Sequence, residues 1–301
     1  FTDRLLFNSE IEIEHADEAY LEFAYLDYRL SDALGLRGGL LLAPIGLVNE
    51  LHEPPVFLGT TRPLVEQALI PTTWRENGFG AFGALGPFSY RAYVINGLNA
   101  AGFSADGFRG GRQKGSGALA EDVAGVIRVD YEGVLGLLAG GSVYRGGSGQ
   151  GLTFGAEEIE ATTTILEGHA SYQARGLDLR ALVATGSLDD AAQLNTALGL
   201  SGAESVGERL VGGYAHAGYD VLRAFDLEHQ LFPFIRYEWL DTQAEVPEGY
   251  AADPANERTA ILLGASWKPV PNVAVKGDYQ IHSNGAETGR NGFALVLSYL
   301  F

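Results

Sequence analysis

The sequence predicts an all-β protein: a transmembrane, up-and-down antiparallel β-barrel of about 14 strands, with 16 possible. Three observations predict this fold. Apolar and polar residues alternate with a period of two, a separation of faces that is typical of strands. The connections between the alternating segments are short and long in turn. Tyr and Trp residues stand near the segment ends, as in the aromatic girdles of outer-membrane barrels.

The composition favours strands and excludes other classes. The 301 residues include 41 Gly, 14 Tyr and 15 Phe, a mixture that is unusual for a helical protein. The absence of Cys excludes disulfides and thiolate metal sites. A net charge of −18 with only three Lys excludes a nucleic-acid-binding face, which needs clustered cations. No uncharged run approaches the roughly 18 residues that cross a bilayer as a helix.

The alternation defines the strands in order along the chain. Near the start, Ile11 and Ile13 alternate with the acidic residues at 10, 12 and 14, so the two kinds point to opposite faces. Near the end, Val275 and Ile281 lie on the face opposite to Lys276. The same test, applied between these two places, gives the remaining strands. The fourteen predicted strands are residues 4–15, 19–29, 34–43, 76–85, 88–97, 121–132, 134–145, 158–175, 177–187, 208–219, 227–240, 256–268, 272–282 and 289–301.

The connections indicate a meander whose two ends differ. The short connections are residues 30–33, 86–87, 133, 176, 220–226 and 269–271, and the long ones are 44–75, 98–120, 146–157, 188–207 and 241–255. The long connections share one end, which is the pattern of an outer-membrane barrel. An even strand number places Phe1 and Phe301 together, on the periplasmic side, and the long connections 98–120, 188–207 and 241–255 then lie on the outside of the cell.

A soluble β-sandwich or barrel is the alternative, because periodicity alone does not exclude it. Strands of about eleven residues match a tilted bilayer crossing and favour the membrane barrel. No change of composition divides the chain, so residues 1–301 are expected to form a single domain. The aromatic residues near strand ends are Tyr131, Tyr144, Tyr219, Trp239 and Trp267.

One stretch resembles a known family. Between Leu21 and Gly83 the chain contains an APIG turn at Ala43–Gly46, NELHEPP at Asn49–Pro55, Arg62–Pro63, and IPTTWREN at Ile70–Asn77. These marks resemble the outer-membrane porins grouped around the phosphate-selective porins O and P. The resemblance implies a passive diffusion channel, usually trimeric, with about sixteen strands. The low Lys content does not match a phosphate-selective lumen.

Alternate residues of each strand form an apolar face and a polar face. If the apolar face points to lipid, the polar face lines a lumen of mixed charge, as a water-filled channel requires. The alternative is that these charges pair across strands and close a narrow lumen. The predicted pore-lining residues are Glu10, Glu12, Glu14, Glu22, Arg37, Arg91, Arg128, Asp130, Glu132, Glu167, Arg175, Asp178, Arg180, Arg236, Glu238, Lys276 and Asp278.

The connection 44–75 is too long for a plain loop, and residues 64–69 within it could form a short helix. It could fold inward and narrow the pore, or it could cap the rim or pack on a neighbouring subunit. In the first case the constriction residues are His52, Glu53, Arg62, Glu66, Arg75 and Glu76. The basic run from Phe108 to Lys114 could attract anionic solutes or lipopolysaccharide phosphates, but its glycines favour a flexible loop.

The sequence therefore predicts an outer-membrane porin of a Gram-negative-type envelope that passes small hydrophilic solutes or ions by passive diffusion. Its expected partners are outer-membrane lipid, lipopolysaccharide, the solutes and two further copies in a homotrimer. The acidic excess predicts a weak cation preference. No catalytic residues, metal or cofactor are expected, since the six His lack zinc-site spacing. The competing interpretations are a structural or plugged barrel within a larger envelope assembly and a barrel lipase.

Overall fold

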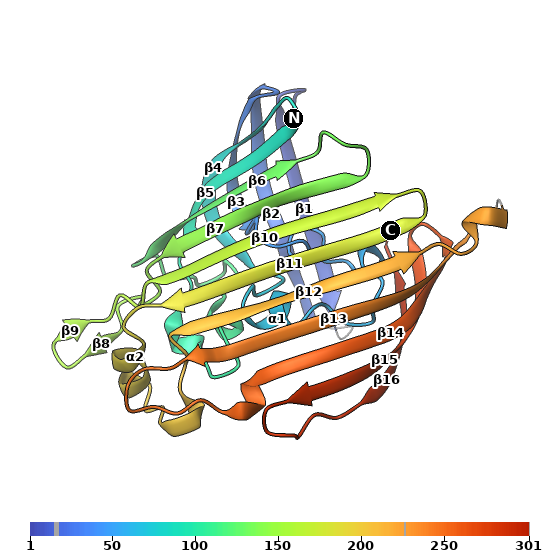
Figure 1. Ribbon diagram of the computed structural model, residues 1–301. Coiled ribbons are helices and arrows are strands. Elements are labelled where there is room, and N and C mark those ends of the chain that lie inside the picture. Colours follow the sequence, from blue (N-terminus) through green and yellow to red (C-terminus); the bar gives the residue numbers. More distant parts are fainter. Residues whose placement is uncertain (15–17, 226, 301) are drawn as a thin grey trace.

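Fourteen long strands form one antiparallel sheet in which each strand pairs with the long strand before it (Figure 1). The structure, a computed structural model, describes residues 1–14, 18–225 and 227–300, without the side chains of residues 13, 14 and 18. The strands are β1 Leu5–Glu14, β2 Glu18–Ser31, β3 Leu34–Leu42, β4 Arg75–Leu85, β5 Phe88–Asn96, β6 Val123–Tyr131, β7 Leu137–Gly146, β10 Thr163–Ala174, β11 Leu177–Leu188, β12 Arg209–Tyr219, β13 Gln230–Glu245, β14 Glu257–Val270, β15 Val273–Asn284 and β16 Gly292–Tyr299.

Each predicted strand corresponds to one of these fourteen, which confirms the all-β fold class. Two boundaries are five residues off: the strand predicted at 227–240 ends only at Glu245, and the strand predicted at 158–175 begins only at Thr163. Ala161 has a left-handed φ of 46°, which interrupts an extended strand. The residues before it form a small hairpin, β8 Thr153–Phe154 with β9 Glu157–Glu158.

The two faces of the sheet have opposite chemistry, as the period of two predicts. Outward side chains are apolar and exposed, for example Val183 and Ile235 in the middle of β11 and β13. The inward parity carries the ionisable residues, for example Arg236 and Asp278, which are buried. An apolar exterior around a polar interior is the inverse of a soluble sandwich and is typical of a membrane barrel.

Short turns and long connections lie at opposite ends of the strands (Figure 1). The connections 43–74, 97–122, 147–162, 189–208 and 246–256 share one end, which also carries helix α2 Ala191–Ala197. Phe1 and Leu300 both lie at the short-turn end, because β1 and β16 run in opposite directions, and Phe301 lies outside the described residues. Within the described residues, no helix is long and apolar enough to cross a membrane.

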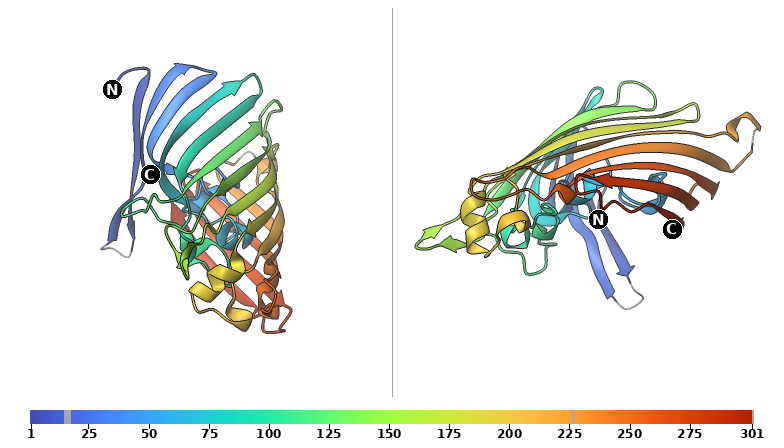
Figure 2. Two further views of the ribbon diagram at one scale, coloured as in Figure 1. Left: turned by 90° about the vertical axis from the view of Figure 1, so that its left-hand side faces the viewer. Right: turned by 60° about the horizontal axis from the view of Figure 1, so that its bottom comes forward.

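The first and last strands form the two edges of the curled sheet. Among the described residues, no ladder joins β1 to β16, so the sheet is open where closure was expected. In both views of Figure 2 the last residues of β1 and the first residues of β2 stand apart from the long connections. β16 lies on the other edge, and its outward residues Phe293, Leu295 and Leu297 are about 70% exposed.

The inner face of the sheet is packed by two connections. Residues 43–74, hereafter the inward connection, contain α1 Val65–Ala68, which contacts β12 and β13. Together with residues from the 97–122 connection, they form an apolar core that includes Leu69, Trp74, Phe108 and Tyr144. The ring centroids of Trp74 and Tyr144 lie 4.8 Å apart. The long-loop end of the interior is therefore filled by chain.

Candidate functional site

Ion pairs between neighbours on the same strand line the inner face. Residues i and i+2 of a strand share a face, so an acid and a base with this spacing meet directly. Three such pairs occur: Arg128–Asp130 at 2.8 Å, Arg180–Asp178 at 2.8 Å and Arg236–Glu238 at 2.7 Å. All six residues were predicted to line a pore. Their side chains do point inward, but the charged groups are largely buried.

A buried network joins β6, β7 and β10. His169 lies between two carboxylates, with Nε2 2.8 Å from Asp130 and Nδ1 2.8 Å from Glu167. The Ser142 hydroxyl donates a hydrogen bond to Glu167 at 2.7 Å. Arg91 on β5 reaches the same Asp130 at 3.2 Å. These carboxylates are therefore paired across neighbouring strands within the wall, as in the alternative that the sequence left open.

The inward connection is bound to β15 by a buried cation and a buried carboxylate. The Lys276 ammonium donates to the backbone carbonyls of Pro54, Phe57 and Gly59, the last at 3.0 Å. The Asp278 carboxylate accepts hydrogen bonds from Thr60 N at 2.7 Å and Thr60 Oγ1 at 2.9 Å. Because each group satisfies the connection's backbone, both act here as anchors.

Charged residues of further strands bind the backbone of the same connection. On β11, Arg180 donates to the Val56 carbonyl at 2.7 Å, and on β13, Arg236 donates to the Thr61 carbonyl at 2.9 Å. Glu238, also on β13, accepts from the Leu64 backbone N–H. Arg128 on β6 donates to the Gly46 carbonyl. The inward-facing charges thus replace water as partners for the loop backbone.

Glu66 of α1 is the most deeply buried acid of the connection. Its carboxylate accepts hydrogen bonds from Tyr214 Oη at 2.8 Å and from Val48 N at 2.7 Å. Burial raises the pKa of Glu66, and these hydrogen bonds oppose the increase. Gly46 has a φ of 74°, and a Cβ there would lie 2.6 Å from the carboxylate. The APIG turn therefore requires glycine to make room for Glu66.

On β2, β3 and β4 the inward charges pair with one another. Arg75 donates to Glu22, and His52 Nε2 lies 3.9 Å from the same carboxylate. Arg37 forms a bidentate pair with Asp27 at 2.7 and 2.8 Å. The Arg37 side chain is 18% exposed to solvent, whereas the Glu22 side chain is only 2% exposed.

The remaining predicted residues lie at the margins. Glu10 and Glu12 are half-buried on β1, and the side chain of Glu14 lies outside the described residues. Arg175 is exposed at the β10–β11 turn with a φ of 55°, so it stands in the turn and not in the predicted strand. Glu132 is exposed at the β6–β7 turn. The loop residues Glu53 and Arg62 are half-buried, and Glu76 lies in β4, buried, where it accepts from Gln113 N at 2.8 Å.

The basic run is packed and not a free loop. Arg109 and Arg112 both donate to the Thr72 carbonyl, at 3.2 and 2.6 Å. Burial, with Arg109 nearby, lowers the pKa of Arg112 to about 10. These side chains border a hollow of about 560 Å³ at the long-loop end, which Lys114 and Glu12 also line. The mouth of the interior is therefore mainly basic.

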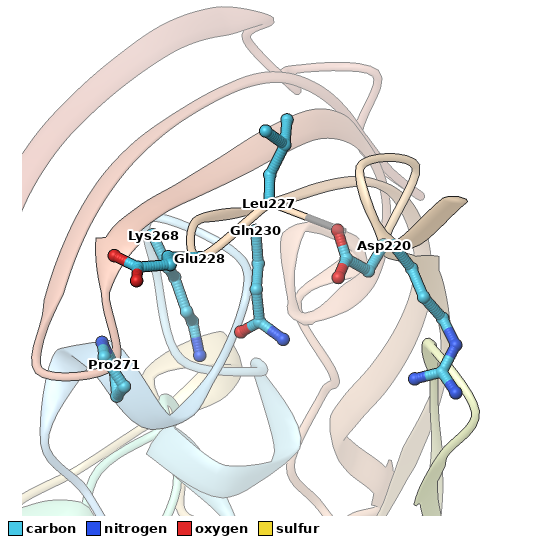
Figure 3. Close-up of a pocket in the computed structure, with 7 residues that line it drawn as sticks. Asp220, Leu227, Glu228, Gln230, Lys268 and Pro271 are labelled. Atoms are coloured by element: carbon cyan, nitrogen blue, oxygen red, sulfur yellow. The ribbon is translucent and has the colours of Figure 1, made fainter. Parts of the chain in front are cut away.

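Further hollows open at the short-turn end, and two of them border inward-facing charges. One, of about 410 Å³, is lined by Leu47, Leu51, Arg128 and the β6–β7 turn. The other, of about 470 Å³, lies beside the β12–β13 connection. Figure 3 shows that the side chains of Gln230 and Lys268, which line this hollow, extend in the same direction. Asp220 in this second hollow accepts from two backbone N–H groups and so stabilises the turn.

Several site residues were not predicted. Tyr214 lies on the inward parity of β12, so a complete parity test would have found it. Asp27 has the opposite parity to Glu22 on β2, because a β-bulge against β1 separates them, so the parity test would have placed Asp27 outward. Glu50 and Asn49 lie in the connection, where no periodicity exists to identify them. In the described part of the chain, no cluster of three or more His, Asp or Glu is placed to hold a metal ion.

A curated relative shows the family. A protein of Aquifex aeolicus (strain VF5), described as uncharacterized, is 39% identical over 297 residues, which is 93% of this chain and 67% of the relative. The chain belongs to the same family as this Aquifex protein. No protein-family model matches the chain.

Solved structures show the fold. OmpF of Salmonella typhi, in complex with daunomycin, aligns with a TM-score of 0.64 at 13% identity, over 99% of this chain and 86% of that one. The trimer form of OmpT, an outer membrane protein of Vibrio cholerae, aligns with a TM-score of 0.56 at 13% identity, over 99% and 87%. The fold is thus that of outer-membrane porin barrels. A specific relation to the phosphate-selective porins is not confirmed.

Proposed function

We propose that this chain is an outer-membrane porin that lets small hydrophilic solutes diffuse passively, as a single domain over residues 1–301. The observation that carries the proposal is the sheet itself, which is apolar outside and ionisable inside and has the porin fold. Hollows at both ends of the inward connection support a path through the interior. In this proposal the connection narrows that path, and no covalent chemistry is involved.

Planar-bilayer recording tests the channel. Purified protein should give open steps of constant size, and liposomes that contain it should swell in small sugars but not in large oligosaccharides. Empty liposomes and heat-denatured protein are the controls. Correctly inserted protein without conductance would contradict the proposal.

A plugged structural barrel is the second candidate, because the inward connection is anchored to β6, β11, β12, β13 and β15. Such a barrel would insert stably and remain closed. Deleting residues 50–62 distinguishes the two candidates. A channel should conduct before the deletion and conduct more after it. A plugged barrel should conduct only after the deletion.

We further propose a weak cation preference. The net charge of −18 and the half-buried Glu10, Glu50 and Glu53 support it, while the basic hollow at the mouth opposes it. The reversal potential in a KCl gradient measures the balance. A clear chloride preference, or block of the current by phosphate, would contradict this proposal and favour the phosphate-porin resemblance.

A homotrimer is also proposed, because a barrel of the same fold is described in a trimer form. The exposed apolar outer face would contact lipid, lipopolysaccharide or the neighbouring copies. Native mass spectrometry in detergent should give three times the mass of the chain, and a monomer under all mild conditions would contradict the trimer.

A further inference from the structure

The inward connection buries the charges of β13 and β15 and leaves Arg37 on β3 and Arg91 on β5 partly accessible. On β13 and β15, beneath the connection, Glu238 and Lys276 are 2% and 1% exposed. On the opposite side, the Arg91 side chain on β5 is 28% exposed, and that of its partner Glu50, on the connection, is 22% exposed. Charged side chains that retain water this far inside a barrel mark the part of the lumen that solvent reaches.

Two hollows border the inward connection from opposite ends of the interior, one at Leu47, Leu51 and Val56 and the other at Arg62 and Thr73. The hollow at the short-turn end is lined by Leu51 and Arg128, and the basic hollow at the long-loop end is lined by Glu22. Glu50 lies 3.6 Å from Arg128, and His52 lies 3.9 Å from Glu22. Residues 50–52 therefore stand between the two hollows.

The charges at this point converge on one carboxylate. Arg91 Nη1 lies 3.0 Å from Glu50 Oε2, and Arg128 Nη1 lies 3.6 Å from the same oxygen. The other carboxylate that these bases share, Asp130, is 1% exposed, so it neutralises them without facing water. Of these groups, Glu50 and Arg91 present their charges to solvent.

We propose that solutes pass between the inward connection and the part of the wall that carries Arg37 on β3 and Arg91 on β5, and that Glu50 determines the charge preference there. This inference rests on the proposed channel function. A single charge acts strongly at a narrow, partly dehydrated point, because few water molecules and ions screen it. Loss of Glu50 leaves Arg91 as the exposed charge, and loss of Arg91 leaves Glu50.

Charge variants test the role of Glu50. Glu50→Gln should shift the K⁺/Cl⁻ permeability ratio toward chloride by about fivefold, and Arg91→Gln should shift it toward potassium. Glu158→Gln changes the net charge equally but lies on the exposed β8–β9 hairpin, so it should leave the ratio unchanged. Equal shifts for Glu50→Gln and Glu158→Gln would overturn the assignment.

Cysteine accessibility tests the route independently, since the chain has no Cys. Glu50→Cys and Arg37→Cys should react with a charged methanethiosulfonate and lose part of their conductance. Ala260→Cys, inward on β14 but 1% exposed, should not react. Reaction and block at residue 260 but not at 50 would place the route on the other side.

The outcomes separate this inference from the proposed function. A wild-type protein that inserts but does not conduct would refute the channel itself. A wild-type protein that conducts normally, with unchanged selectivity in Glu50→Gln and no reaction at Glu50→Cys, would refute only the route and the role of Glu50.

Discussion

Lys276 shows how much a single buried residue does in this interior. Its ammonium is the shared donor for three carbonyls of the inward connection and is 1% exposed. A buried cation is tolerated only when its hydrogen bonds are satisfied, and the carbonyls depend on it in turn. The buried Lys276 ammonium and the inward connection therefore stabilise each other.

Lys276→Met should destabilise the protein by about 2–4 kcal/mol, because it leaves buried carbonyls without a donor. Denaturant unfolding in detergent, followed by tryptophan fluorescence, measures the change. Lys268→Met is the matched control. Lys268 also faces inward on β14, but it borders the short-turn hollow, so its loss should cost less than about 1 kcal/mol. Equal losses would contradict the anchoring role.

Glu66 should make stability depend on pH. Because burial raises its folded pKa above the ordinary 4.5, its contribution is fully present below 4.5 and is lost as the pH rises through the folded pKa. Glu66→Gln keeps an acceptor for Val48 N and should flatten the decrease in stability above pH 4.5. Urea midpoints from pH 4 to pH 8 measure this, and parallel curves for the two proteins would contradict it.

At the scale of elements, the strands could be predicted and the path of the inward connection could not. Alternation is a local property, so Ile127 against Arg128 is visible within a few residues. The connection is positioned by Asp278 and Arg236, which lie more than 170 residues away in the sequence. No local pattern in residues 50–62 encodes those partners. For the same reason Glu50 could not be recognised, whereas Lys276 and Arg37 were placed on the correct face.

Asn49 closes the base of the connection. Its amide donates to the carbonyls of Ala43 and Trp74 at 2.8 and 3.0 Å, and its oxygen accepts from Trp74 N at 2.8 Å. Asn49→Ala should cost about 2–4 kcal/mol, since it leaves buried backbone groups unpaired. In bilayers the variant should show larger and noisier open steps. Asn8→Ala on edge strand β1 is the control and should change neither quantity.

At the scale of the whole molecule, the outer face must match a hydrocarbon environment. Ile235→Arg, in the middle of β13, should destabilise the bilayer-inserted protein by roughly 2–4 kcal/mol. Glu248→Arg, in the connection after β13, should be close to neutral. Folding titrations in lipid vesicles provide the comparison. Equal tolerance at both positions would mean that the outer face is not in contact with lipid.

The anchors of the inward connection also impose an order on assembly. Thr60 and Asp278 are 218 residues apart, and Lys276 is 222 residues from Pro54. Contacts at such separations form late, because the intervening chain must first be arranged. The β15 partners cannot be in place until the last quarter of the chain has joined the sheet. Until then the connection's polar backbone remains hydrated, so docking of residues 54–64 should expel water in a late step of folding.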